Sequence, residues 1–165
     1  MSDNGLLKIA LGGGCHWCTE AVFQSLSGVV NVEQGYVSSI GDNKTFSEGV
    51  VVHFDVAKIT LSTLVKVHLH THKSTSEHSM RRKYRSAIYT FSKEQATIVG
   101  EIFKQVQPVF KDPIITKILP FRNFRPSESR YLNYYLSNPE KPFCENHITP
   151  KMAKLGILYG GALKH

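Results

Sequence analysis

A glycine-rich junction near the N-terminus, Gly12-Gly13-Gly14 followed by Cys15, constrains the fold more than any other stretch. The apolar run at 6–11 predicts a short buried strand before the junction, and an amphipathic run reaching Leu26 predicts a helix after it. Consecutive glycines permit a tight, positive-φ turn between the two elements. Cys15 therefore falls at a helix N-terminus, where unpaired N–H groups and the helix dipole favour the reactive thiolate.

Two other interpretations of this junction carry less weight. A glycine-rich turn between strand and helix can cradle phosphate, but the spacing fits neither a Walker A loop nor the dinucleotide fingerprint, and no Lys-Ser/Thr pair follows. A cysteine is also commonly a small buried hydrophobe. The neighbouring Trp17 and Cys18, together with three glycines, favour a reactive Cys15 over an inert core thiol.

The length and the charge balance narrow the class of protein. The 165 residues suit one domain with a sizeable core, spanning 1–165. The formal net charge of +7 is partly local, because Arg81, Arg82, Lys83 and Arg85 lie almost together. Such a run predicts a solvated or anion-facing surface. Since only one aromatic interrupts it and no nucleic-acid-binding module is recognisable, we expect no nucleic-acid partner.

The hydropathy pattern and the cysteine count bear on the compartment. No apolar run reaches the roughly 18 residues that a membrane span needs. The start of the chain has no charged segment followed by a long apolar one, so a secretory signal is not expected and we predict a cytoplasmic protein. Three cysteines are an odd number, which in such a protein points to catalytic or redox thiols before structural bridges.

The order of predicted elements indicates the fold class. Further strands are predicted at 29–37, 49–54, 85–91 and 114–119, and further helices follow the capping residues Thr60 and Ser92. Loops are expected at 38–44 and 71–83. The opening βαββαβ order is that of the split βαβ, ferredoxin-like arrangement. We therefore expect a single α+β domain with an added strand, an appended helix at 127–136 and a Pro- and Gly-punctuated tail at about 138–165.

Several blocks, in order along most of the chain, resemble one family. They are Gly-Gly-Cys-His-Trp-Cys-Thr-Glu-Ala-Val-Phe at 13–23, Leu-Ser-Gly-Val at 26–29, Gly-Tyr at 35–36, Glu48 before Val-His-Phe-Asp at 52–55, Tyr-Arg-Ser-Ala-Ile-Tyr at 84–89, and a C-terminal segment with Asn-Pro at 138–139 and Phe-Cys at 143–144. Together they resemble the A-type peptide methionine sulfoxide reductases. The resemblance implies an oxidoreductase that reduces methionine S-sulfoxide, free or in proteins, and so repairs oxidative damage.

The resemblance also assigns roles to single residues. Cys15 matches the nucleophile that attacks the sulfoxide sulfur, and Trp17 matches the aromatic that cradles the substrate methyl group. Glu48 matches the acid that hydrogen-bonds the sulfoxide oxygen, a task that needs a protonated carboxyl in a desolvating pocket. Tyr84 matches a second donor to that oxygen. Without the resemblance, Trp17 would be interpreted as a core tryptophan, Glu48 as a solvated charge at a strand edge, and Tyr84 as a tyrosine at the start of a strand.

Three positions depart from the family pattern. His16 stands where phenylalanine is common, so it either lines the substrate pocket and titrates near neutrality or is a surface neighbour of Cys15. Phe46 falls where a tyrosine with a functional hydroxyl often stands, and the segment between Tyr36 and Glu48 is short. Ser79 falls where the family usually has an aspartate. These changes bear on substrate preference rather than on the nucleophile.

The product of oxygen transfer is a sulfenic acid on Cys15, which condenses readily with a nearby thiol. Cys18 lies one helical turn away, on the same helix face. Cys144 lies where the family often has its resolving thiol, in a tail whose prolines and glycines suggest that it can swing over the pocket. We favour Cys144 for a first or relay disulfide, with Cys18 as the alternative. The resemblance implies thioredoxin, or another dithiol, as external reductant and no bound cofactor.

Other functions remain open on the sequence alone. A thiol–disulfide oxidoreductase could use Cys15-x-x-Cys18, although it would not need Glu48 and Tyr84. A binding module could have kept the pocket and lost turnover. The histidines His68, His70, His72 and His78 could suggest zinc, but they lack the paired spacing of closed zinc sites, so we predict no metal. We expect a monomer.

Overall fold

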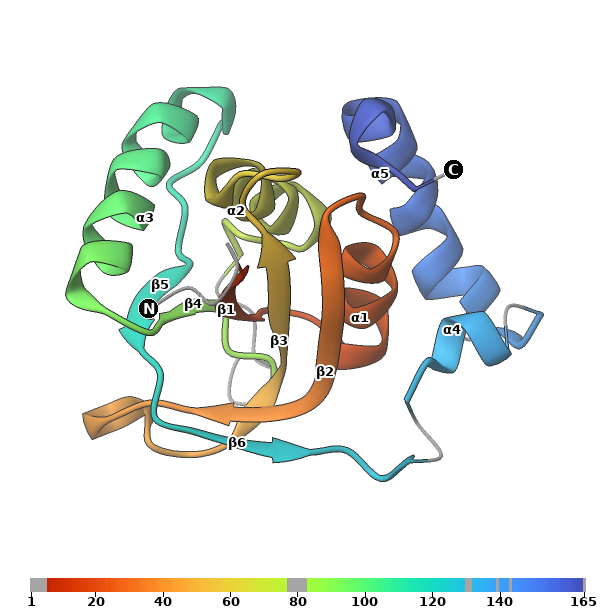
Figure 1. Cartoon of the computed structure of the whole chain (residues 1–165), viewed down its shortest axis with the longest axis horizontal. Coiled ribbons are helices and arrows are strands. Elements are labelled where there is room, and N and C mark those ends of the chain that lie inside the picture. The colour runs from red at the N-terminus through yellow and green to blue at the C-terminus, as the bar shows by residue number, and fades with distance from the viewer. Residues whose placement is uncertain (1–5, 77–82, 130–131, 139, 143, 165) are drawn as a thin grey trace.

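The computed structural model describes residues 6–76, 83–129, 132–138, 140–142 and 144–164 (Figure 1). Ser79 and His78 of the sequence analysis, and Arg81 and Arg82 of its basic run, lie outside the described residues. Arg85, which closes that run, is buried and donates to the Thr45 carbonyl oxygen at 2.6 Å, so it is not the solvated side chain that the sequence suggests.

A six-stranded sheet with the order β5-β4-β1-β3-β2-β6 forms the centre of the molecule. Its strands are β1 Leu6–Gly12, β2 Val29–Ser38, β3 Ser47–Asp55, β4 Ala87–Thr90, β5 Lys117–Pro120 and β6 Asn123–Pro126. All neighbouring strands are antiparallel except β4 and β5. The inner order β4-β1-β3-β2, with helices between β1 and β2 and between β3 and β4, is the split βαβ arrangement. The predicted ferredoxin-like α+β core is confirmed.

Three helices, α1 (His16–Gln24), α2 (Leu61–Thr71) and α3 (Lys93–Val106), pack on one face of the sheet. Alternate residues of the central strands face them, since side chains two apart on a strand share one face. Ile9 and Leu11 of β1 thus join Phe23 of α1 in the main core, whereas Ala10 belongs to a smaller cluster on the other face. The amphipathic pattern of the sequence therefore decides which face of the sheet the helices cover.

The two predicted N-caps are confirmed. Thr60 Oγ1 accepts a hydrogen bond from the Thr63 N–H at 3.1 Å, at the start of α2. Ser92 Oγ accepts from the Gln95 N–H at 3.0 Å, at the start of α3. Each cap satisfies an N–H that has no partner within its helix, so both helices begin where local chemistry places them.

The region after β5 differs from the prediction. The helix expected at 127–136 is wrong for most of the described residues of that range, where the α-helix is α4 (Tyr134–Ser137). Before it, β6 pairs with β2, Arg125 opposite Tyr36, and the Ser127 N–H continues this pairing to the Gln34 carbonyl oxygen at 3.0 Å. An open sheet edge has unpaired backbone groups, and pairing with them outweighs a weak local helix preference.

The Pro- and Gly-punctuated tail expected at about 138–165 is helical in most of its described residues. A π-helical turn at Cys144–Ile148 leads into α5 (Thr149–Tyr159). Pro150 lies in the first turn of α5, where the missing N–H costs nothing, so it marks the start of a helix and not a break. The buried Leu155 fixes α5 to the main core, and α5 contacts α1 (Figure 1). Within the described residues, no helix is long and apolar enough to cross a bilayer.

Candidate active site

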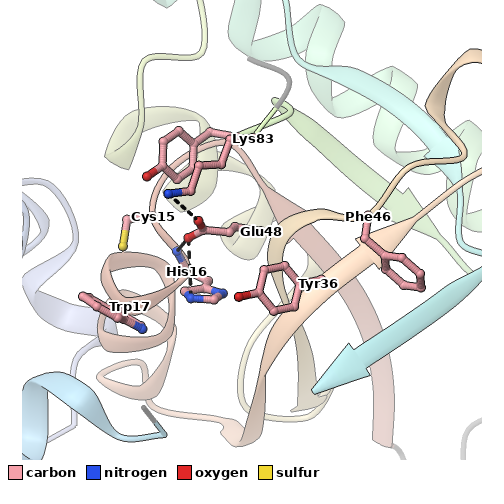
Figure 2. A pocket seen from close by; sticks show the side chains of 8 residues that line it. Cys15, His16, Trp17, Tyr36, Phe46, Glu48 and Lys83 are labelled. Atoms are coloured by element: carbon pink, nitrogen blue, oxygen red, sulfur yellow. Dashed lines mark hydrogen bonds and ion pairs between the residues drawn. The ribbon is translucent and has the colours of Figure 1, made fainter. Parts of the chain in front are cut away.

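One cavity of about 430 Å³ collects six of the residues that the sequence singles out as site or departure positions. It opens where α1 begins, beside β2, β3 and the segment before β4, and it is lined by Cys15, His16, Trp17, Tyr36, Phe46, Glu48, Lys83 and Tyr84. Figure 2 shows Cys15 and Trp17 on one side of Glu48, with Tyr36 and Phe46 on the other. A thiol, a carboxyl and a phenol thus face the same space.

The glycine junction has the predicted tight geometry. Gly13 has a φ of +150°, and a Cβ added there would come within 2.5 Å of the His72 ring. Cys15 follows as the N-cap residue of α1, and its carbonyl oxygen accepts from the N–H groups of Cys18 and Thr19 at 3.0 and 3.1 Å. Only glycine fits at position 13, because both the φ and the close ring exclude a side chain.

The two histidines that lie behind the junction, His68 in α2 and His72 at its C-terminal end, pack on each other and hydrogen-bond neighbouring segments. His68 Nε2 donates to the Gly12 carbonyl oxygen at 2.8 Å, and the rings of His68 and His72 stack at 4.2 Å. His72 Nε2 lies 2.8 Å from Ser86 Oγ of the segment leading into β4. Among the residues that the structure describes, no three His, Cys, Asp or Glu side chains gather as metal ligands.

The first two cysteines behave as a coupled pair. Their side chains hydrogen-bond each other, and this bond lowers the pKa of Cys18, whereas it raises the pKa of Cys15, which burial raises further. The pair therefore shares one negative charge through this hydrogen bond, and its two proton losses belong to the pair and not to either sulfur alone. From the helix terminus alone, the sequence predicts a thiolate on Cys15. The structure instead gives a charge spread over two sulfurs, because Cys18 is hydrogen-bonded to Cys15. Proton transfer from Cys15 to Cys18 makes the Cys15 thiolate.

Lys151 on α5 is a neighbour of this pair that the sequence analysis misses. Its Nζ lies 3.4 Å from the point where a Cβ on Gly14 would stand. The positive charge of Lys151 lowers the pKa of Cys18, while burial lowers the pKa of Lys151 itself. No local signal identifies Lys151, because it reaches the pair only through the packing of α5 on α1.

We expect Lys151→Met to make the cysteine pair less reactive. Without the ammonium group the first pKa of the pair rises. Each unit of rise lowers the fraction of thiolate at neutral pH about tenfold. Alkylation by iodoacetamide, followed as a function of pH, measures this shift. Lys154→Met, on an exposed position of the same helix, is the control and should leave the profile almost unchanged. Equal profiles for Lys151→Met and the parent would contradict the role of Lys151.

Cys144 lies next to this pair, but not on a swinging tail. Its side chain has 0% exposure and packs with Cys18, Ala21 and Ile148, and this cluster also contacts Cys15. Burial raises the pKa of the Cys144 thiol, and the nearby Cys18 raises it further. None of the three cysteines is in a disulfide. The sequence suggests a thiol on a tail that reaches the pocket, and the structure places this sulfur in a π-helical turn beside Cys18.

Glu48 is a buried carboxyl and not a solvated strand-edge charge, since its exposed fraction is 6%. The His16 N–H donates to Oε1 at 3.2 Å, and Lys83 Nζ lies 3.5 Å from Oε2. The Glu48 N–H donates to the Lys83 carbonyl oxygen at 3.1 Å, which fixes the segment carrying Tyr84 beside β3. Backbone pairing therefore brings the two expected oxygen-side donors together.

His16 lines the pocket, so the surface alternative of the sequence analysis is wrong. The residue is 5% exposed, and Nδ1 donates to the Gly35 carbonyl oxygen at 2.9 Å. Nε2 lies 3.5 Å from Glu48 Oε1 (Figure 2). The Tyr36 ring meets the His16 ring edge-on at 5.2 Å.

Trp17 is half-buried at the cavity and stacks on Tyr134 of α4, with ring centroids 4.2 Å apart and planes inclined by 16°. The buried Glu20 holds this partner, because its carboxyl accepts from the N–H groups of Asn133 and Tyr134 at 3.0 and 3.2 Å. Tyr134 covers one face of the indole, so a substrate in the cavity meets an aromatic wall that is fixed from behind.

Tyr36 is a second residue that the sequence analysis does not list as functional. Its hydroxyl points toward His16 in Figure 2. Phe46 has no hydroxyl to offer, and the Arg125 guanidinium lies 4.7 Å from its ring and 5.0 Å from the Tyr36 ring. The signal for Tyr36 is its presence in the Gly-Tyr block at 35–36.

Comparisons with known proteins identify the family of this chain. The family model described as peptide methionine sulfoxide reductase matches residues 7–157. The peptide methionine sulfoxide reductase MsrA of Trichodesmium erythraeum is 36% identical over 163 residues, covering 89% of this chain and 92% of that protein.

Two solved structures share the fold. Methionine sulfoxide reductase A of Corynebacterium diphtheriae superposes with a TM-score of 0.73 at 26% identity, covering 85% of this chain and 78% of that one. Mxr1 of Saccharomyces cerevisiae, in complex with Trx2, superposes with a TM-score of 0.64 at 24% identity, covering 81% of this chain and 87% of that one. The family model extends over most of the described core, from β1 into α5. The chain belongs to the peptide methionine sulfoxide reductase family.

Proposed function

We propose that this protein reduces methionine S-sulfoxide, free or in proteins, to methionine. The observation that carries the proposal is the meeting of Cys15, the buried Glu48 and Tyr84 in one cavity beside Trp17. Sulfoxide reduction needs a sulfur nucleophile on one side of the substrate and hydrogen-bond donors on the other. Family membership supports the same reaction.

In this mechanism the Cys15 thiolate attacks the sulfoxide sulfur while Glu48 and Tyr84 face the oxygen. The sulfur–oxygen bond of the substrate breaks, and the oxygen ends on Cys15 as a sulfenic acid. The substrate sulfur gains the electron pair that Cys15 gives up, and one proton goes to the transferred oxygen. Trp17, stacked on Tyr134, offers the apolar wall for the substrate methyl group.

Recycling proceeds through both remaining cysteines. Cys18, already hydrogen-bonded to Cys15, attacks the sulfenic acid and releases water. Cys144, packed against Cys18, then attacks the Cys18 sulfur, which frees Cys15 and moves the disulfide to Cys18 and Cys144. An external dithiol reduces this disulfide. Mxr1 forms a complex with Trx2, and we propose thioredoxin as the reductant here.

Replacing each resolving cysteine should separate these steps. Cys144→Ser should keep one fast turnover, accumulate a Cys15–Cys18 disulfide and lose most multiple turnover with thioredoxin. Cys18→Ser should also transfer one oxygen, but its Cys15 sulfenic acid should persist long enough to be trapped with dimedone. Mass spectrometry of the oxidised variants identifies each species. Normal cycling of Cys18→Ser through a Cys15–Cys144 disulfide would rule out Cys18 as the first resolving thiol.

Turnover with the two separate epimers of methionine sulfoxide tests the proposed function itself. We expect the S-epimer, free or in a peptide, to be reduced with dithiothreitol or thioredoxin, and the R-epimer to be left intact. Reduction of insulin disulfides without any sulfoxide reduction would instead identify a thiol–disulfide oxidoreductase. Binding of the sulfoxide without turnover would identify a binding module.

The free thiols support a proposal for the compartment in which the protein acts. Three free cysteines fit a reducing compartment, so we propose that the protein acts in the cytoplasm. We also propose that it works as a monomer without a bound cofactor, since the reaction needs only cysteine thiols and an external dithiol.

A further inference from the structure

His16 is held with one ring nitrogen fixed and the other facing the proposed acid. Nδ1 donates to the Gly35 carbonyl oxygen at 2.9 Å, and because a carbonyl oxygen can only accept, Nδ1 carries hydrogen in every protonation state that keeps this bond. Nε2 is therefore the nitrogen that gains or loses a proton. It lies 3.5 Å from Glu48 Oε1, and both side chains are buried (Figure 2).

Groups from several elements surround this imidazole. Glu48 faces it from β3, Lys83 from the segment before β4, Tyr36 from β2, and Trp17 follows it on α1 at a ring distance of 6.1 Å. The pKa of His16 lies below its ordinary value, chiefly because of burial; the Gly35 bond and the Glu48 charge raise it, and the Lys83 charge lowers it further. The protonation of His16 thus depends on the charge of Glu48.

We propose that His16 and Glu48 hold one exchangeable proton between Nε2 and Oε1, and that this pair is the proton source for the sulfoxide oxygen. The inference rests on the proposed function and adds His16 to it as a proton-relay partner. At 3.5 Å the two atoms form an ion pair when His16 is protonated, and a small approach brings them to hydrogen-bond distance.

The proton balance of the pair closes over one turnover. The loaded pair is either an imidazolium beside a carboxylate or an imidazole beside a carboxylic acid. When the oxygen leaves the substrate sulfur for Cys15, the one shared proton passes from Glu48 to that oxygen; if it was on Nε2, it first moves to Glu48 Oε1. The pair is left as imidazole and carboxylate. It reloads from solvent water.

A shared proton predicts a particular pH dependence. A carboxyl–imidazole pair loses its one proton at a higher pH than the carboxyl would lose it alone, because either group can hold the proton. The donor is therefore present below the pKa of the pair and lost as the pH rises through it. Removing the imidazole moves that loss to lower pH.

His16→Asn tests this inference, because its amide can still donate to the Gly35 carbonyl oxygen but nothing titrates at the Nε2 position. We expect the basic limb of the single-turnover rate to move at least one unit lower, with roughly tenfold loss at pH 7.5 and little loss at pH 5. A rate reduced equally at all pH values, or a profile that overlays the parent's, would overturn the relay and leave the proposed function intact. A parent without sulfoxide turnover at any pH would overturn both.

A titration of the His16 ring by NMR gives a readout that does not depend on activity. Glu48→Gln should move the His16 midpoint to lower pH, because the carboxylate favours the imidazolium. Lys83→Met should move it to higher pH, because an opposing positive charge is removed. His16→Asn assigns the signal among the eight histidines by its loss. An unchanged midpoint in Glu48→Gln would show that the two groups hold no proton in common.

Discussion

Cys15→Ser should abolish sulfoxide reduction, with no detectable turnover even in a single-turnover experiment. A serine hydroxyl does not ionise near neutral pH, and the two remaining thiols do not replace the lost sulfur at the cavity wall, since Cys18 and Cys144 are both buried. The change replaces one atom in a half-buried side chain, so the fold should persist. Single-turnover reduction of a sulfoxide peptide, followed by mass spectrometry, measures the loss.

Two matched variants make this result specific to Cys15. Cys18→Ser and Cys144→Ser make the same sulfur-to-oxygen change within the same cluster, and each should still transfer one oxygen. Circular dichroism of the three variants should coincide with that of the parent. If Cys15→Ser kept a rate close to the parent's, the oxygen acceptor would have to be another residue.

Glu48→Gln should slow oxygen transfer by about 10²- to 10⁴-fold, the usual contribution of a positioned acid. Glutamine keeps the volume of the side chain and an oxygen that can accept from the His16 N–H, but it has no acidic proton to give. Single-turnover kinetics separate the chemical step from recycling. Alkylation of the cysteine pair should be retained and should begin at a slightly lower pH, because the Glu48 charge raises the pKa of both thiols.

Glu33→Gln is the matched control for this change. Glu33 lies on the neighbouring strand β2, more exposed, with its carboxyl 3.2 Å from His53 Nε2, so it offers another glutamate–histidine pair outside the cavity. Its rate should match the parent's. A Glu48→Gln rate within a few-fold of the parent's would remove Glu48 from the proposed mechanism.

Local chemistry explains which parts of the fold the sequence predicts. The glycine junction, the two capped helices and the alternating strands each depend on residues close together in the chain. β6 depends instead on the open edge of β2, which the short run Asn123–Pro126 does not reveal. The sequence does not predict α5, because a proline such as Pro150 can either open a helix or break one. Which applies is clear only once the position of the first turn is known.

Some site residues can likewise be found from the sequence, whereas others are brought to the site only by packing. The quoted sequence blocks include Cys15, Glu48 and Tyr84, and the structure brings all three to one cavity. Lys151 belongs to none of these blocks, because its contact with the cysteines arises from the packing of α5 on α1. The sequence does not predict the charge shared by Cys15 and Cys18 either, since spacing gives proximity on a helix but not a hydrogen bond between the two sulfurs.

The stacking of Trp17 on Tyr134 has a spectroscopic consequence. Trp17 is the only tryptophan of the chain, so all indole fluorescence comes from the cavity wall beside Cys15. The stacked phenol and the neighbouring sulfur cluster set the emission of the resting enzyme. Substrate arrival, sulfenic acid formation and disulfide relay each change the surroundings of this one fluorophore, and the unlabelled protein therefore carries an optical probe of its own catalytic cycle.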